Sequence, residues 1–207
     1  ARVDFPVAAK QVAMNESYLC IRSVEDDVWC WGKDTHVPRK IEGLPDKAQA
    51  VHVTSTEACA ITETSGEVWC WESRWNRCHL LDEKTSEDHV FTRIEGIEGA
   101  THFSSSGRCA FSDKGKAWCW YQHPTERSSH IGGALPVSGV ADTKELTGEY
   151  YSQCALSHKG KVSCWKTSWN TPEKPPKASS FHALRDVVEF SGKSALHRDG
   201  TVSYDGK

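Results

Sequence analysis

The sequence predicts an all-β fold, a single five-bladed β-propeller of antiparallel, three- to four-stranded blades that spans residues 1–207. A cysteine-framed segment recurs four times, as CIRSVEDDVWC, CAITETSGEVWC, CAFSDKGKAWC and CALSHKGKVSC. A fifth copy, SALHRDGTVSY, has Ser194 and Tyr204 in place of both cysteines. The copies begin at positions 20, 59, 109, 154 and 194. The repeat is therefore about 40 to 50 residues long, which is the length of one propeller blade.

Each copy has the pattern of a β-hairpin. The fourth copy is symmetric about Lys159, so Leu156 is expected to lie opposite Val162. Its loop, His158-Lys159-Gly160, ends in glycine, as in a type I turn followed by a glycine bulge. Asp tolerates the same left-handed backbone better than most residues. The equivalent loop position holds Asp26, Gly115 and Gly200 in the other copies of matching length.

Another short β-rich run precedes each hairpin, and Gly and Pro turn signals separate the runs. The last copy reaches only its second hairpin strand, near Tyr204. We expect the N-terminal segment Arg2-Val3-Asp4-Phe5-Pro6 to supply the missing outer strand and to close the ring. The alternative is an open stack of hairpins, which would leave sheet edges exposed.

The eight framing cysteines have two interpretations, disulfides within each hairpin or buried thiols that act as small apolar side chains. The joint loss of both cysteines in the fifth copy favours disulfides, since opposed residues of a hairpin lie within bonding reach. Disulfides imply an oxidising location: secreted, extracellular, periplasmic or on the cell surface. There, Asn15-Glu16-Ser17 would be an N-glycosylation triplet in a eukaryotic host. The expected pairs are Cys20–Cys30, Cys59–Cys70, Cys109–Cys119 and Cys154–Cys164.

Cys78 lies in an insertion outside the repeat pattern. We expect it to be unpaired within the domain. A leftover cysteine in a secreted protein indicates a free thiol or a bridge to another chain, so a dimer through Cys78 stays open.

Composition excludes several classes of partner. The formal net charge is -3, which gives no general attraction to nucleic acid or to an anionic membrane. No run of Lys and Arg indicates a basic patch, and no apolar stretch is long enough for a bilayer-spanning helix. Nine tryptophans against one methionine favour a rigid β-rich body.

The pattern Cys-Ala-Leu, a turn with Gly, and then Val-x-Cys-Trp-Gly resembles the repeat of the regulator-of-chromosome-condensation superfamily, above all its cysteine-rich bacterial-type members. The match is best at Cys154-Ala155-Leu156 with Val162-Ser163-Cys164-Trp165, and at Val28-Trp29-Cys30-Trp31-Gly32. The resemblance covers essentially the whole chain and implies the propeller fold. Family members usually have seven blades and a Gly-Gln-Leu-Gly element that is absent here. The resemblance therefore implies the fold and not the function, because propellers carry unrelated functions.

The tryptophans fall into two groups. Those at two recurring positions are expected to pack between blades: Trp29, Trp69 and Trp118, and Trp31, Trp71, Trp120 and Trp165. Two Trp-Asn pairs break the repeat and follow their hairpins at the same offset, so we expect them on one face of the disc. They are predicted to bind a ligand, together with two residues in the matching loop of the third copy. The predicted binding residues are Trp75, Asn76, Tyr121, His123, Trp169 and Asn170.

The sequence lacks the common enzyme motifs. The sequence has no Gly-x-Ser-x-Gly elbow and no Walker-type phosphate loop. Cys78-His79 with His89, and His123 with His130, are the only candidate zinc ligands, and solvated loops explain them better. Solvation equally explains the acid pair Asp26-Asp27. A glycosidase with carboxylates in the propeller channel stays open. We expect no enzymatic activity, no metal and no cofactor.

These observations favour a secreted binding module that recognises a protein partner through one face of the propeller. A resemblance to propeller-type β-lactamase inhibitors supports an inhibitor-like or adhesive role. The alternative is a lectin, because Trp beside Asn suits stacking on a sugar ring. Lectin sites recur in most blades, whereas the Trp-Asn pair occurs in two copies.

Overall fold

The chain is built from β-strands, as a computed structural model shows for residues 4–32, 37–54, 57–72, 91–105, 108–120, 133–149, 152–166, 175–180, 184–191 and 194–204. These residues contain no helix, so the all-β prediction is confirmed. In particular, no helix in them is long and apolar enough to cross a membrane. The chain divides into two compact units, unit 1 at Ala1–Ile94 and unit 2 at Glu95–Lys207.

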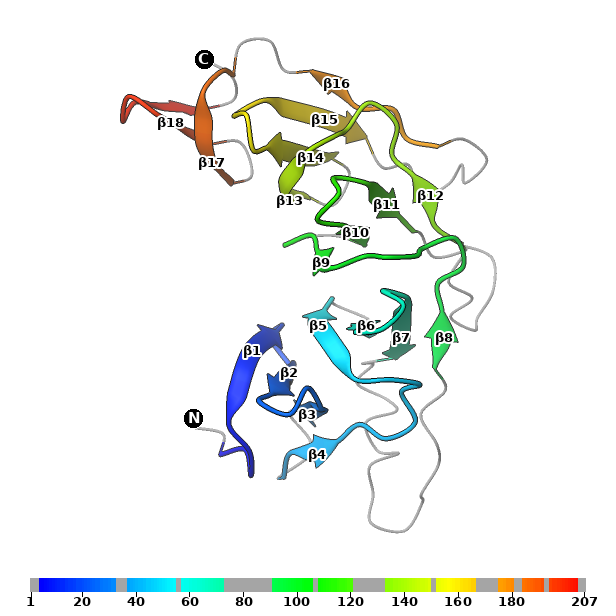
Figure 1. Cartoon of the computed structure of the whole chain (residues 1–207). Coiled ribbons are helices and arrows are strands. Elements are labelled where there is room, and N and C mark those ends of the chain that lie inside the picture. The colour runs from blue at the N-terminus through cyan, green and yellow to red at the C-terminus, as the bar shows by residue number, and fades with distance from the viewer. Residues whose placement is uncertain are drawn as a thin grey trace. The chain divides into compact units, whose positions relative to one another are not determined.

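Unit 1 contains two four-stranded antiparallel sheets, in which the strands pair in chain order. Figure 1 shows them as neighbouring sheets in blue and cyan. Sheet 1 consists of β1 (Ala9–Met14), β2 (Tyr18–Ser23), β3 (Val28–Gly32) and β4 (Arg39–Lys40). Sheet 2 consists of β5 (Ala48–Val53), β6 (Glu57–Thr62), β7 (Val68–Glu72) and β8 (Thr92–Arg93).

Unit 2 contains three antiparallel sheets, and the last has three strands among the residues that the structure describes. Sheet 3 consists of β9 (His102–Phe103), β10 (Cys109–Phe111), β11 (Ala117–Cys119) and β12 (Leu135–Pro136). Sheet 4 consists of β13 (Thr143–Glu149), β14 (Ser152–Ser157), β15 (Val162–Lys166) and β16 (Ser179–Ser180). Sheet 5 consists of β17 (Val187–Ser191), β18 (Ser194–His197) and β19 (Val202–Tyr204).

The second and third strands of every sheet form the repeated hairpin, which cysteines frame in the first four sheets. Leu156 lies opposite Val162, in the predicted register. Cysteines that face each other are bonded in the first four sheets, with Cα–Cα distances of 4.0 to 4.1 Å. In sheet 5, Ser194 and Tyr204 face each other at the same place. The disulfides are the four predicted pairs, Cys20–Cys30, Cys59–Cys70, Cys109–Cys119 and Cys154–Cys164.

The sheets pack face to face within each unit, with the disulfides in the core. In unit 1, one apolar cluster joins Val28 of sheet 1 to Val51 and Trp71 of sheet 2. In unit 2, a cluster that includes Trp165 joins sheets 3 and 4. Trp71, Trp120 and Trp165 are all buried, as predicted for a repeated packing position. Trp31, at the same position in sheet 1, is half-buried.

Candidate functional site

Every sheet has two ends, and they offer different chemistry. The tip end carries the turns between the second and third strands, at 24–27, 63–67, 112–116, 158–161 and 198–201. The far end is where the third strand finishes, as β7 does at Glu72 and β15 at Lys166. Because the third strand starts at the tip, segments that follow it in the chain leave from the far end.

The predicted binding residues follow the far ends in the sequence. Trp75 and Asn76 follow β7, Tyr121 and His123 follow β11, and Trp169 and Asn170 follow β15. All six residues lie outside the described residues, as do Cys78 and the candidate zinc ligands His79, His89 and His130. Their role therefore stays a prediction.

At the far end of sheet 2 in unit 1, aromatic side chains pack against one another. Trp71 is buried and donates from its indole Nε1 to the Tyr18 hydroxyl at 3.5 Å. Phe91 meets the Trp71 ring edge-on, with ring centroids 5.6 Å apart. These aromatic rings fix the position of the last residues of β7, from which the Trp75 insertion departs.

Asn15 joins sheets 1 and 2 at this end. Its Nδ2 donates to the Thr54 carbonyl at 2.6 Å, and its Oδ1 accepts from the backbone N–H groups of Ser17 and Tyr18. Both sides of the amide are therefore used in the fold. The triplet Asn15-Glu16-Ser17 acts as a turn and an inter-sheet tie.

Glu57 is the one buried carboxylate near several sulfur atoms in the described part of the chain. One oxygen of its carboxylate lies within 4.8 Å of the Cys59 and Cys70 sulfurs, and the relative exposure of Glu57 is 1%. Those sulfurs are bonded to each other, so neither is a thiolate, the form of cysteine that ligates zinc. The group therefore does not have the donors of a metal site.

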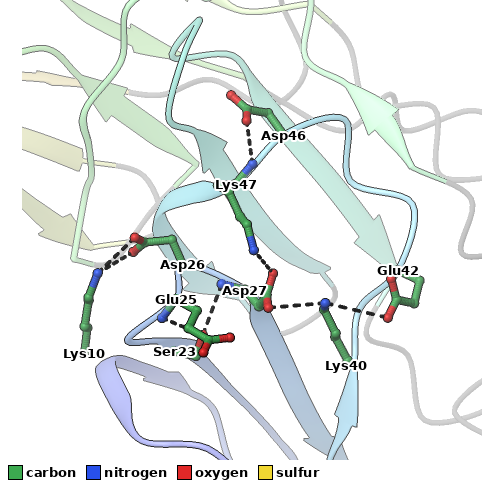
Figure 2. A network of polar contacts seen from close by, with 9 residues as sticks. All are labelled: Lys10, Ser23, Glu25, Asp26, Asp27, Lys40, Glu42, Asp46 and Lys47. Atoms are coloured by element: carbon green, nitrogen blue, oxygen red, sulfur yellow. Dashed lines mark hydrogen bonds and ion pairs between the residues drawn. The ribbon is translucent and has the colours of Figure 1, made fainter.

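The tip of sheet 1 is held by ion pairs, which Figure 2 shows from close by. Asp26 accepts from Lys10 Nζ at 2.9 and 3.0 Å, and it pairs with Arg22 at 3.0 Å. Asp27 bridges Lys40 and Lys47. The hydrogen bond from Lys10 lowers the pKa of Asp26, and that from Lys47 lowers the pKa of Asp27. The expectation that Asp26-Asp27 is merely solvated is wrong, because the turn places both carboxylates beside cations.

The tips of unit 2 use glycine instead. Gly115 and Gly160 have φ of 79° and 74°, which is the left-handed region. A Cβ at Gly115 would lie 2.2 Å from the backbone nitrogen of Asp142 in sheet 4. The same position in sheet 1 is Asp26, at φ 65°. Glycine thus lets the tip of sheet 3 touch the backbone of the next sheet.

Lysines flank these two glycines. From the sequence, the hairpin turns with Lys114 and Lys159 are the alternative binding face if the aromatic insertions are not the site, but sequence reasoning missed their shared positive charge. Lys114 and Lys116 border Gly115, while Lys159 and Lys161 border Gly160, and all four are exposed. The available signal was the repeated Lys-Gly-Lys at one position of the repeat. A search for runs of basic residues does not detect it, because the two occurrences are far apart in the sequence.

Two other titratable groups have shifted pKa values. Burial lowers the pKa of His52, on β5, to about 4, so its imidazole is neutral at physiological pH. Burial also raises the pKa of Glu145, on β13, and the nearby carboxylate of Glu189 adds to that effect. Glu145 and Glu189 hold the same register position on neighbouring inner strands, each opposite a leucine.

No protein-family model and no curated protein sequence matches this chain. Solved structures do match it. Prp20p of Saccharomyces cerevisiae, the yeast RCC1, is 17% identical with a TM-score of 0.58, over 93% of this chain and 56% of Prp20p. Human WBSCR16 is 15% identical with a TM-score of 0.61, over 94% of this chain and 60% of WBSCR16.

A plant receptor domain is also similar. The CRINKLY WD40 ectodomain of the Arabidopsis thaliana receptor kinase ACR4 is 14% identical with a TM-score of 0.54, over 95% of this chain and 65% of the ectodomain. The chain thus spans less than two thirds of the length of each of these three proteins. At such identities the likeness concerns the fold alone, and it agrees with the repeat pattern in the sequence: the five sheets are of the β-propeller blade type.

Proposed function

We propose that this chain is a secreted, non-enzymatic binding module that recognises a protein partner through the aromatic insertions at the far ends of its sheets. The observation that carries the proposal is the strand order. In sheets 2, 3 and 4 the third strand runs from the tip to the far end, and the chain there departs from the repeat. The repeat does not require these residues for its packing. Aromatic residues in such loops are suited to be binding anchors.

The secreted location rests on the cysteines. Disulfides persist in oxidising compartments and are rare in the cytosol and nucleus. Four of them lie in the cores of four sheets, each within one hairpin. An inhibitor-like or adhesive role is consistent with this stable frame.

Protein binding also has support from the neighbours. Prp20p has been characterised for binding to Gsp1p and histones. That property belongs to Prp20p, and at 17% identity it supports only the general use of this fold as a protein-binding surface.

The test is the double variant Trp75→Ala with Trp169→Ala. Wild type and variant are applied side by side to a glycan array and to secreted proteins of the native source. The proposal expects a protein partner that the wild type retains and the variant loses, with an unchanged melting temperature. If the wild type binds glycans and the double variant does not, the lectin is favoured. Equal capture of partners by both chains would show that the anchors lie elsewhere.

Buried tryptophans of the same two repeats provide the matched control. Trp71→Ala and Trp165→Ala remove core side chains, and each should lower the free energy of unfolding by about 3–5 kcal/mol. If the Trp75/Trp169 variant loses stability to the same extent, those residues are core and the proposed site is wrong.

We also propose that residues 1–207 form one ring, closed by Arg2-Val3-Asp4-Phe5-Pro6 as the outer strand of sheet 5. The four other sheets have a two-residue outer strand paired at the second cysteine, whereas sheet 5 leaves Tyr204 65% exposed at that position. Deleting residues 1–6 should then lower the melting temperature sharply. Unchanged melting would contradict closure and would leave the binding proposal standing.

A further inference from the structure

The tip end of unit 2 carries a concentration of positive charge. Its six cations come from all three sheets of the unit or from the turns that lead into them, and all are exposed. In the described part of the chain none of them makes an ion pair. We call this set the basic tip surface: Lys114, Lys116, Lys159, Lys161, Arg185 and Arg198.

The three tips form one continuous surface because backbone contacts join them. The tip of sheet 3 meets Asp142 at the start of sheet 4, through the close approach of Gly115. The backbone N–H of His158, in the tip of sheet 4, donates to the same Asp142 carbonyl at 3.1 Å. The Val187 N–H of sheet 5 donates to Gly160 at 3.2 Å. The lysines beside each glycine are therefore neighbours on a fixed frame.

Most of the carboxylates among these tips make hydrogen bonds within the fold. Asp113 accepts from the Thr101 hydroxyl at 3.0 Å and contacts His102 Nε2 at 2.8 Å, and the first of these bonds is the main cause of its lowered pKa. Asp199 accepts from the Thr201 hydroxyl and backbone, which lower its pKa in the same way. Asp142 contacts His158 Nδ1 at 3.1 Å. Asp186 is exposed and makes no ion pair among the described residues. The six cations thus stand beside four carboxylates, those of Asp113, Asp142, Asp186 and Asp199, and the surface keeps an excess of positive charge.

The fold itself does not explain these cations. Exposed lysines without partners add little to stability. The chain as a whole is negatively charged, so composition does not account for their gathering either. The tips that carry them are preorganised, since two are fixed at the base by the disulfides Cys109–Cys119 and Cys154–Cys164. A rigid surface with an excess of unpaired cations is suited to steering and orienting a partner of opposite charge.

We propose that the basic tip surface is a second interaction surface, one that binds an acidic segment of a protein. It lies at the opposite end of the strands from the far ends, where β7, β11 and β15 finish, and it does not depend on the aromatic insertions that follow them in the sequence. A protein segment fits better than a nucleic acid, because a single-stranded nucleic acid site also needs aromatic side chains on which bases stack. The His158 imidazole is the only aromatic ring in the tips at 112–116, 158–161 and 198–201, and it already contacts Asp142 at 3.1 Å.

The experiment measures binding of a fluorescent poly-glutamate peptide to the full chain at low ionic strength. The key variant is Lys159→Glu, and its matched control is Lys166→Glu. Both residues are exposed lysines of sheet 4, one at the tip and one at the far end of β15, and both changes alter the net charge equally. We expect Lys159→Glu to weaken binding by about fivefold and Lys114→Glu with Lys159→Glu by at least about tenfold. Lys166→Glu should leave it nearly unchanged.

Three results would overturn the proposal. One is no binding of poly-glutamate by the wild type at low salt. Another is equal weakening by Lys159→Glu and Lys166→Glu, which would show a general charge effect. The third is tighter binding of heparin or of single-stranded oligo(dT), lost in the same variants, which would identify a polyanion site. If the double reversal unfolds, Lys114→Gln with Lys159→Gln repeats the test without new charge.

Discussion

The tips of sheet 1 and of sheets 3 and 4 occupy the same place in the repeat but are stabilised differently. In sheet 1, side chains make the connection, because Asp27 bridges Lys40 on the same sheet and Lys47 just before sheet 2. In unit 2 the backbone makes it, through Gly115 and Gly160. One contact is common to both: the tip carbonyl of Asp26 accepts from the Ala48 N–H at 3.0 Å, as Gly160 accepts from Val187.

This difference suggests a reason why charged residues at one repeat position make ion pairs in sheet 1 but stay unpaired in sheets 3 and 4. The position of Asp27 is Lys116 in sheet 3 and Lys161 in sheet 4. Where glycine makes the contact to the next sheet, the adjacent residue is not needed as a bridge and can face a partner. Where ion pairs contribute to the contact, cations and carboxylates neutralise one another and the surface presents little net charge.

The largest expected loss of stability is at Gly115, where the backbone rather than side chains joins neighbouring sheets. Gly115→Ala should lower the free energy of unfolding by about 3 kcal/mol or more, because a left-handed alanine is strained and its Cβ would meet the backbone of Asp142. Gly200→Ala has the same type of backbone, φ 85°, with no atom within 4 Å, and should lose only about 1 kcal/mol. Denaturant unfolding of the full chain measures both. Equal losses would mean that close approach is not what joins sheets 3 and 4.

The disulfides should behave alike in the two units, which tests whether the difference is confined to the tips. Replacing Cys20 and Cys30 by Ala in unit 1, or Cys154 and Cys164 in unit 2, should lower the free energy of unfolding by about 2–3 kcal/mol, since each bridge closes a loop of similar length. Thermal and denaturant unfolding compare the two variants. Peptide mapping without reduction should recover all four bridges. Alkylation of all eight framing cysteines in the native, unreduced protein would refute both the bridges and the proposed secreted location.

The smallest expected effect concerns the ion pairs of sheet 1. Asp27→Asn should lower the free energy of unfolding by about 0.5–1 kcal/mol at neutral pH. Because the folded pKa of Asp27 lies below 3.8, this contribution is complete above that value and disappears as the pH falls through the folded pKa. Wild type and variant should therefore converge in acid. Asp186→Asn, which removes a carboxylate without an ion pair in the described residues, should change stability by less than about 0.5 kcal/mol.

Much of the fold could be predicted because the repeat contains local information. Symmetry about Lys159 gives the register of Leu156 and Val162, and the loss of both cysteines in one copy gives the disulfides. The basic tip surface could not be predicted in this way. Lys114 and Lys159 are 45 positions apart, and packing between sheets is what brings their tips together. The Trp-Asn pairs at Trp75 and Trp169 occur in only two copies, so their interpretation rests on their shared offset from the hairpin and on the direction of the third strand.

The disulfides have a consequence for how the chain is made. Each joins residues only 10 or 11 positions apart. Short loops close with the least loss of chain entropy, so each native pair meets often in an unfolded, reduced chain. Cys78, eight positions after Cys70, offers the one shorter loop and is the competitor that Cys59 must outpace. In an oxidising compartment the other three bridges can form hairpin by hairpin, with little need for isomerase-catalysed reshuffling. A new blade added by gene duplication brings both of its own cysteines, and a blade that loses them, as sheet 5 has, leaves the other pairs unchanged.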